Sequence, residues 1–128
     1  MQIIDPGHFY VLNQLDDDGT QLLRFVKRVG EGYPGNEGLP YAGVQMQEVL
    51  RVLIDRLQYV CLQAEKLEDH ASVETDTECI RLLRICLWEL ETRAARRHGR
   101  ELHNRPDIEH DPVCDGCGHI GCDRKCDR

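Results

Sequence analysis

The chain has 128 residues, enough for one small domain, and 41% of them are hydrophobic while only 5% are aromatic, which predicts a modest, mostly aliphatic core. Its formal net charge of −7 argues against a general nucleic-acid-binding or membrane-surface protein, since both need a net basic face. The sequence shows no cationic start followed by an apolar segment and no long uncharged apolar run, so we expect a cytoplasmic protein that is neither secreted nor membrane-spanning.

The first part of the sequence predicts an antiparallel β-hairpin. Apolar runs at residues 9–12 and 22–26 flank Asp16–Gly19, and Asp-Gly is a strong hairpin turn signal. Met1–Asp5 is short, and we interpret it as a strand edge or a lead-in. Because a two-stranded hairpin is marginally stable in water, we expect it to pack on helices or to pair with a further strand, which another subunit could supply.

A glycine-rich loop follows, from Gly30 to Gly43, and it cannot form a regular element. Its letters GEGYPG match G-x-G-x-x-G, but the dinucleotide-binding motif places its last glycine in a helix that begins at the loop, and here more loop follows. One interpretation is a plain connector. The other is a binding loop whose flexible backbone covers a small anion. In this interpretation two cations supply positive charge and a tyrosine ring supplies a stacking surface. The ligand-binding candidates of this stretch are Lys27, Arg28, Tyr33 and Asn36.

Two long helices are predicted next. Apolar residues recur at spacings of three and four from Val44 to about Lys66, and again along a second helix that ends near His98. We expect the second helix to begin at a capping box, Thr75–Glu78, after an acidic connector. We also expect the two helices to pair antiparallel. Their wide apolar stripes exceed what the β-hairpin can cover, so the sequence favours a homo-oligomer.

Basic side chains gather at the end of the second helix. Arginine forks suit phosphate groups, so this cluster is a second candidate for binding an anion, with compensation of the helix dipole as the alternative. Its candidate ligand-binding residues are Arg93 and Arg97, and Arg51 on the first helix is a weaker candidate. Trp88, the only tryptophan, is interpreted as core or interface packing, with base stacking as the alternative.

Four cysteines crowd into the end of the chain, after a polar linker at residues 101–112. Their spacing, C-x2-C-x4-C-x3-C, suits a tetrahedral zinc site whose four thiolates leave no open position, so we expect structural zinc rather than disulfides. The motif resembles a retroviral-type zinc knuckle in which a cysteine replaces the usual histidine. The expected ligands are Cys114, Cys117, Cys122 and Cys126.

The sequence as a whole predicts an α+β protein, with a small N-terminal antiparallel β-sheet followed by two long antiparallel helices. Residues 1–100 form the expected ligand-binding domain, and residues 113–128 form a short Cys-rich zinc-binding tail. The sequence contains neither H-E-x-x-H nor G-x-S-x-G, and its histidines are scattered, so we do not expect an enzyme.

Three stretches, FVKRVGEGYPGN, MQEVLRVLIDRLQYV and LRICLWELETRAARRHGR, resemble a family of small phage proteins, the first-described type of Thoeris anti-defence protein. The likeness leaves out the Cys-rich tail. The resemblance implies a protein of the infected bacterial cell that sequesters a cyclic ADP-ribose-type signalling nucleotide without degrading it. It also implies dimers or hexamers with ligand sites between subunits, and cyclic oligonucleotides as further ligands.

Two other hypotheses remain open at this point. One is a zinc-knuckle regulatory protein that binds nucleic acid or a host protein through its tail, although the net charge of −7 weighs against nucleic acid. The other is a helical scaffold that binds no small ligand.

Overall fold

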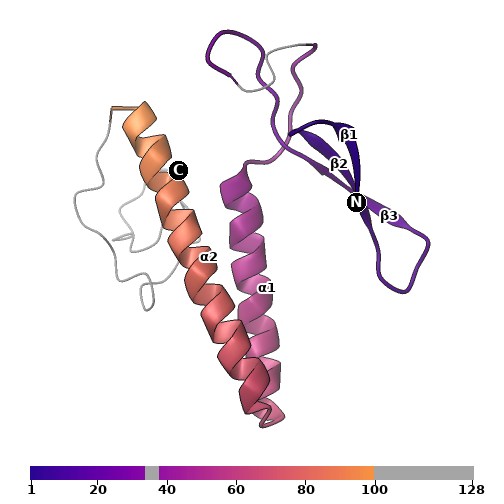
Figure 1. The fold of residues 1–128 in the computed structure, drawn as a ribbon, viewed down its shortest axis with the longest axis vertical. Coiled ribbons are helices and arrows are strands. Elements are labelled where there is room, and N and C mark those ends of the chain that lie inside the picture. Colours follow the sequence, from indigo (N-terminus) through magenta and orange to yellow (C-terminus); the bar gives the residue numbers. More distant parts are fainter. Residues whose placement is uncertain (34–37, 100–128) are drawn as a thin grey trace. The chain divides into compact units, whose positions relative to one another are not determined.

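The expected α+β architecture is confirmed. The computed structural model describes residues 1–33 and 38–99, and they form a three-stranded antiparallel sheet followed by two helices (Figure 1). The chain divides into two compact units, Met1–Met46 and a helical unit that begins at Gln47.

The sheet is a meander in the order β1-β2-β3, with β1 at Gln2–Asp5, β2 at Phe9–Asn13 and β3 at Thr20–Arg24. Both pairs of neighbouring strands are antiparallel. The hairpin of β2 and β3 therefore gains its further strand from the start of the same chain, which makes it a more stable unit than two strands alone.

The β2–β3 turn lies at the predicted Asp-Gly sequence. Asp16 adopts the left-handed conformation, with φ of 62°, and the backbone N–H of Gly19 donates to Oδ1 of Asp17 at 2.7 Å. An aspartate tolerates this backbone and can bond the chain two residues on, so the local sequence accounts for the turn. The turn fixes a register in which Phe9 lies opposite Arg24.

The two helices are α1, Met46–Lys66, and α2, His70–Arg97. The predicted start of α2 at Thr75 is wrong, because Thr75 lies inside the helix and its Oγ1 donates to the carbonyl of Ala71 at 3.1 Å. The N-cap is Asp69, whose side chain accepts from the backbone N–H of Ser72 at 3.2 Å and from its hydroxyl at 2.7 Å. The connector between the helices is therefore a short turn. At the other end, His98 is the C-cap and Gly99 has φ of 69°, as the predicted stop requires.

The core of the helical unit is small and aliphatic. Ile54 and Leu87 are almost fully buried, and four half-buried residues pack against them: Leu50, Ile80, Leu83 and Trp88. This confirms core packing as the interpretation of Trp88. The pair of helices is antiparallel, since Arg51 early in α1 contacts Glu91 late in α2, and Cys61 late in α1 contacts Thr77 early in α2. Within the described residues, neither helix is long and apolar enough to cross a membrane.

Candidate functional site

The glycine-rich loop closes at its base, beside the end of β3. Lys27 and Tyr41 exchange two backbone hydrogen bonds, of 3.0 and 3.2 Å, and the backbone N–H of Val26 donates to the carbonyl of Val44 at 3.0 Å. The N–H of Val44 donates in turn to the carbonyl of Arg24 at 2.9 Å. The chain thus leaves the sheet at residue 28 and returns to the same place at residue 40 (Figure 1).

Gly43 permits this return because no side chain would fit there. A Cβ atom at this position would lie 2.4 Å from the carbonyl oxygen of Arg24 and 2.7 Å from the backbone nitrogen of Val26. Both of these atoms belong to the backbone and cannot move aside without opening the base of the loop. The sequence marks Gly43 only as one glycine of a loop, whereas the structure gives it a steric role.

One carboxylate ties the base of the loop to the sheet. Oδ2 of Asp5 accepts a hydrogen bond from Nζ of Lys27 at 2.8 Å and another from the hydroxyl of Tyr41 at 2.6 Å. The hydrogen bond from Lys27, followed by that from Tyr41, lowers the pKa of Asp5 below its ordinary value. Burial, together with the bond to Asp5, raises the pKa of Tyr41 to about 12. Asp5 is therefore a carboxylate and Tyr41 a neutral donor at neutral pH.

This contact changes what Lys27 offers to a ligand. Its side chain is only 9% exposed, and its charge is compensated by Asp5. Gly38 on the returning arm lies close to it, since a Cβ at Gly38 would be 3.6 Å from Nζ. Lys27 therefore holds the base of the loop in place. An anion that bound here would compete with the carboxylate of Asp5 for the positive charge of Lys27.

Arg24 is the cation that sequence reasoning missed. Its side chain is exposed, and its guanidinium carbon lies 5.6 Å from the ring centre of Tyr41 and 5.9 Å from that of Phe9. In the described part of the chain, no carboxylate forms an ion pair with Arg24. A guanidinium held against aromatic rings keeps its planar set of N–H donors for a phosphate. The group of Asp5, Phe9, Arg24, Lys27 and Tyr41 is called the loop-base cluster below.

Two other residues predicted as ligand-binding, Arg28 and Tyr33, are exposed. Arg28 is exposed directly after Lys27, and Tyr33 is 46% exposed, with its backbone N–H donating to the carbonyl of Gly30 at 3.4 Å. The ring of Tyr33 is thus free to stack on a ligand. Asn36 lies outside the described residues.

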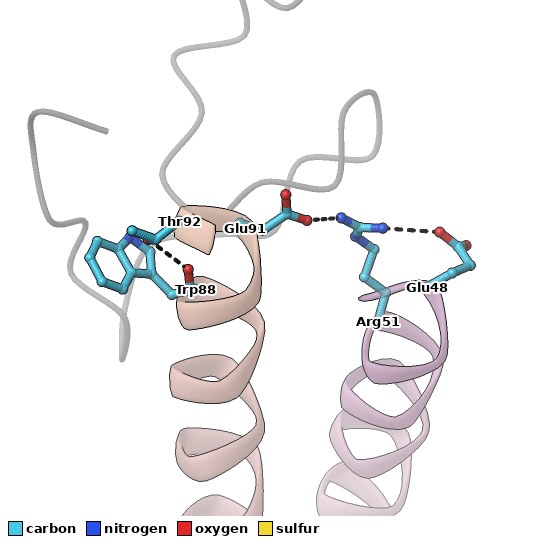
Figure 2. A network of polar contacts seen from close by, with 5 residues as sticks. All are labelled: Glu48, Arg51, Trp88, Glu91 and Thr92. Carbon is cyan, nitrogen blue, oxygen red and sulfur yellow. Dashed lines mark hydrogen bonds and ion pairs between the residues drawn. The ribbon is translucent and has the colours of Figure 1, made fainter. Parts of the chain in front are cut away.

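The predicted arginines of the helices belong to the other unit. Arg51 binds Glu48 at 3.1 Å and also pairs with Glu91, so it joins the start of α1 to the end of α2 (Figure 2). Arg93 and Arg97 are exposed on the last turns of α2. The prediction that these arginines bind an anion stays a prediction.

Trp88 and Thr92 lie on the same part of α2 as Glu91, but their side chains are on the far side of the helix from Arg51 in this view (Figure 2). The hydroxyl of Thr92 donates to the backbone carbonyl of Trp88 at 2.9 Å, which satisfies that hydroxyl within its own helix.

The predicted metal ligands, Cys114, Cys117, Cys122 and Cys126, all lie outside the described residues. Within residues 1–33 and 38–99, no group of three or more histidine, cysteine, aspartate or glutamate side chains is placed to hold a metal ion. The zinc site of the tail stays a prediction from spacing. Comparison of the chain with protein-family models, with curated proteins and with solved structures finds no match.

Proposed function

We propose that this protein binds a cyclic ADP-ribose-type nucleotide and sequesters it without degrading it, as an anti-defence protein of a phage acting in the cytoplasm of the infected bacterium. The observation that carries the binding proposal is Arg24, an exposed guanidinium held against two aromatic rings at the base of the glycine-rich loop. The choice of nucleotide and the biological setting come from the family resemblance of the sequence.

Arg24 of the loop-base cluster and two exposed residues of the following chain, Arg28 and Tyr33, suit the two chemical parts of such a ligand. A pyrophosphate needs N–H donors with positive charge, which Arg24 and the neighbouring Arg28 offer. A base needs a flat apolar surface, which the half-exposed ring of Tyr33 offers. Asp5 and Lys27 hold the base of the loop in place, so less order has to be gained on binding.

A sequestering protein must bind at low signal concentration, and a nanomolar dissociation constant corresponds to about −12 kcal/mol. One arginine and one ring supply only part of this. We therefore propose that the site is completed where protomers meet in a dimer or hexamer.

The test measures retention of the ligand. Full-length protein is mixed with a cyclic ADP-ribose isomer, free ligand is removed by filtration, and the bound fraction is released by heat and identified by mass spectrometry. We expect intact nucleotide. The variant Arg24→Gln removes charge-assisted hydrogen bonds of about 1.5–3 kcal/mol, so its affinity should fall about ten- to a hundred-fold.

The chain offers a matched control in Arg56, which also lies over a tyrosine ring, 5.9 Å from the centre of Tyr59, but on α1. Arg56→Gln should retain the nucleotide as the unchanged protein does. Equal binding by Arg24→Gln, with an unchanged circular dichroism spectrum, would contradict the site. Recovery of hydrolysed product would contradict sequestration and place the protein among enzymes.

A further inference from the structure

The carboxylate of Asp5 uses only one of its two oxygens inside the loop-base cluster. Oδ2 accepts from both Nζ of Lys27 and the hydroxyl of Tyr41, at 2.8 and 2.6 Å. In the part of the chain that the structure describes, no hydrogen bond or ion pair reaches Oδ1. The side chain of Asp5 is 31% exposed, whereas that of Lys27 is 9% exposed. Oδ1 is therefore an acceptor that remains for a ligand.

An irregularity in β1 places this carboxylate in line with Arg24. After Ile3, a regular strand would bring Ile4 opposite Phe9, but the register shifts there and Asp5 takes that position instead. Phe9 in turn lies opposite Arg24. Because directly opposite residues share a face of the sheet, Asp5, Phe9 and Arg24 form one row across the three strands. The Cα atoms at its ends are about 10 Å apart, since each strand spacing is about 4.8 Å.

Tyr41 shows that the two ends of this row belong to one site. Its hydroxyl bonds Asp5, while its ring centre lies 5.6 Å from the guanidinium carbon of Arg24. The row therefore presents a cation at one end and a carboxylate at the other, with the half-buried ring of Phe9 between them. The hydrogen bond from Lys27, followed by that from Tyr41, lowers the pKa of Asp5, so the carboxylate is ionised at neutral pH.

Such a row discriminates among the groups of a nucleotide. An ionised carboxylate only accepts hydrogen bonds, so it repels a phosphate and attracts a hydroxyl. A guanidinium only donates, and it suits the phosphate. In a nucleotide these two groups are neighbours, because the ribose that carries the 5′-phosphate also carries hydroxyls on its far side.

We propose that Oδ1 of Asp5 accepts a hydrogen bond from a ribose hydroxyl of the nucleotide whose pyrophosphate binds Arg24. This inference rests on the proposed function and adds to it a specificity-determining residue. Asp5 makes the site select a ribonucleotide over an analogue that lacks the hydroxyl, because the analogue leaves a charged acceptor without its partner.

The test compares ligands that differ by one hydroxyl. The probes are the cyclic ADP-ribose isomer that the full-length protein retains and its analogues, each of which lacks one ribose hydroxyl. Dissociation constants are measured by titration calorimetry. For the unchanged protein, one analogue should bind about ten- to a hundred-fold more weakly than the parent, as expected for the loss of one hydrogen bond to a charged group. In Asp5→Ala, that ratio should fall to about one.

The ratio separates recognition by Asp5 from its structural role. Tyr41→Phe removes one of the two bonds to Oδ2 but keeps Oδ1, so it should retain the ratio whatever happens to the two affinities. If Asp5 only holds the base of the loop, Asp5→Ala should weaken the parent and the analogue equally and leave the ratio unchanged, which would overturn the proposal.

A second substitution guards against loss of the fold, which circular dichroism checks. In Asp5→Asn the amide oxygen turns toward the two donors, Lys27 and Tyr41, and an NH₂ group that cannot accept takes the place of Oδ1. The ratio should fall in this variant too. Equal binding of the parent and every analogue by the unchanged protein would overturn the role of Asp5 alone, whereas failure of that protein to retain any isomer would overturn the proposed function with it.

Discussion

At the scale of single residues, Asp5 connects parts of the candidate site that are far apart in the sequence. Its carboxylate accepts from Lys27, 22 positions along the chain, and from Tyr41, 36 positions along. The sequence predicts Lys27 as a free cation because it follows a strand and precedes a loop. The structure pairs it with a carboxylate, and no local pattern could reveal that partner.

The ionisation of Tyr41 reports this contact directly. The raised pKa, about 12, means that the neutral hydroxyl is favoured in the folded protein. The stability this contributes is fully present below the ordinary tyrosine pKa of 10.0 and is lost as the pH rises through about 12. We expect Asp5→Asn to lower the pKa of Tyr41 toward 10.0, measured by NMR of ring-labelled tyrosine. Tyr59, on α1, serves as the internal control. An unchanged titration of Tyr41 would show that Asp5 does not hold it.

Arg24 was missed for a related reason. Arg24 stands between Leu23 and Phe25 in the second apolar run, and a polar residue at an alternate position of a strand gives no reason to expect a site. Its role depends on lying opposite Phe9 and beside Tyr41. Strand register and the return of the loop set both contacts. Both the strand register and the return of the loop depend on the folding of the whole N-terminal unit.

At the scale of elements, the start of α2 shows how two local signals can compete. Thr75–Glu78 has the letters of a capping box, but Asp69 and Ser72 offer an earlier cap. The earlier cap adds residues 70–74 to the start of α2, about one and a half helical turns. The capping box is thus overridden, and Glu78 binds Arg81 on the helix surface instead.

The two caps can be separated by substitution. Asp69→Ala removes the acceptor for the N–H of Ser72 and should lower the thermal midpoint of unfolding of the helices, whereas Thr75→Ala should change it little. The hydrogen bonds from Ser72 lower the pKa of Asp69, so its contribution should be present above the ordinary value of 3.8 and lost as the pH falls through the lowered pKa. Circular dichroism at pH 7 and pH 2 measures both effects. A larger loss for Thr75→Ala than for Asp69→Ala would place the cap where the sequence alone predicts it.

At the scale of the whole molecule, two units and a tail carry separate parts of the proposal. The N-terminal unit holds the loop-base cluster, the helical unit carries the apolar stripes from which we expect a homo-oligomer, and the Cys-rich tail is the predicted zinc site. If nucleotide retention belongs to the first two parts, it should not depend on the third.

Removal of the tail tests this division. We expect the full-length protein to hold about one zinc ion per chain, because four thiolates complete a tetrahedral site. Deletion of residues 113–128 should abolish zinc binding, measured by elemental analysis, and leave nucleotide retention within about two-fold, a free-energy change far below that of one hydrogen bond to a charged group. Cys79→Ser, in the helical unit, is the control and should keep the zinc. Loss of nucleotide retention on deletion would instead favour the zinc-knuckle hypothesis.

The sequence by itself determined the order of elements in this protein: a hairpin at an Asp-Gly turn, a glycine-rich loop, and two amphipathic helices ending at Gly99. These features follow from periodicity and turn chemistry, which act between neighbours in the chain. Only the tertiary structure decided that Lys27 is paired with Asp5 and that Arg24 lies against two rings. Those outcomes depend on contacts between distant residues, and a local pattern carries no information about which distant groups will meet.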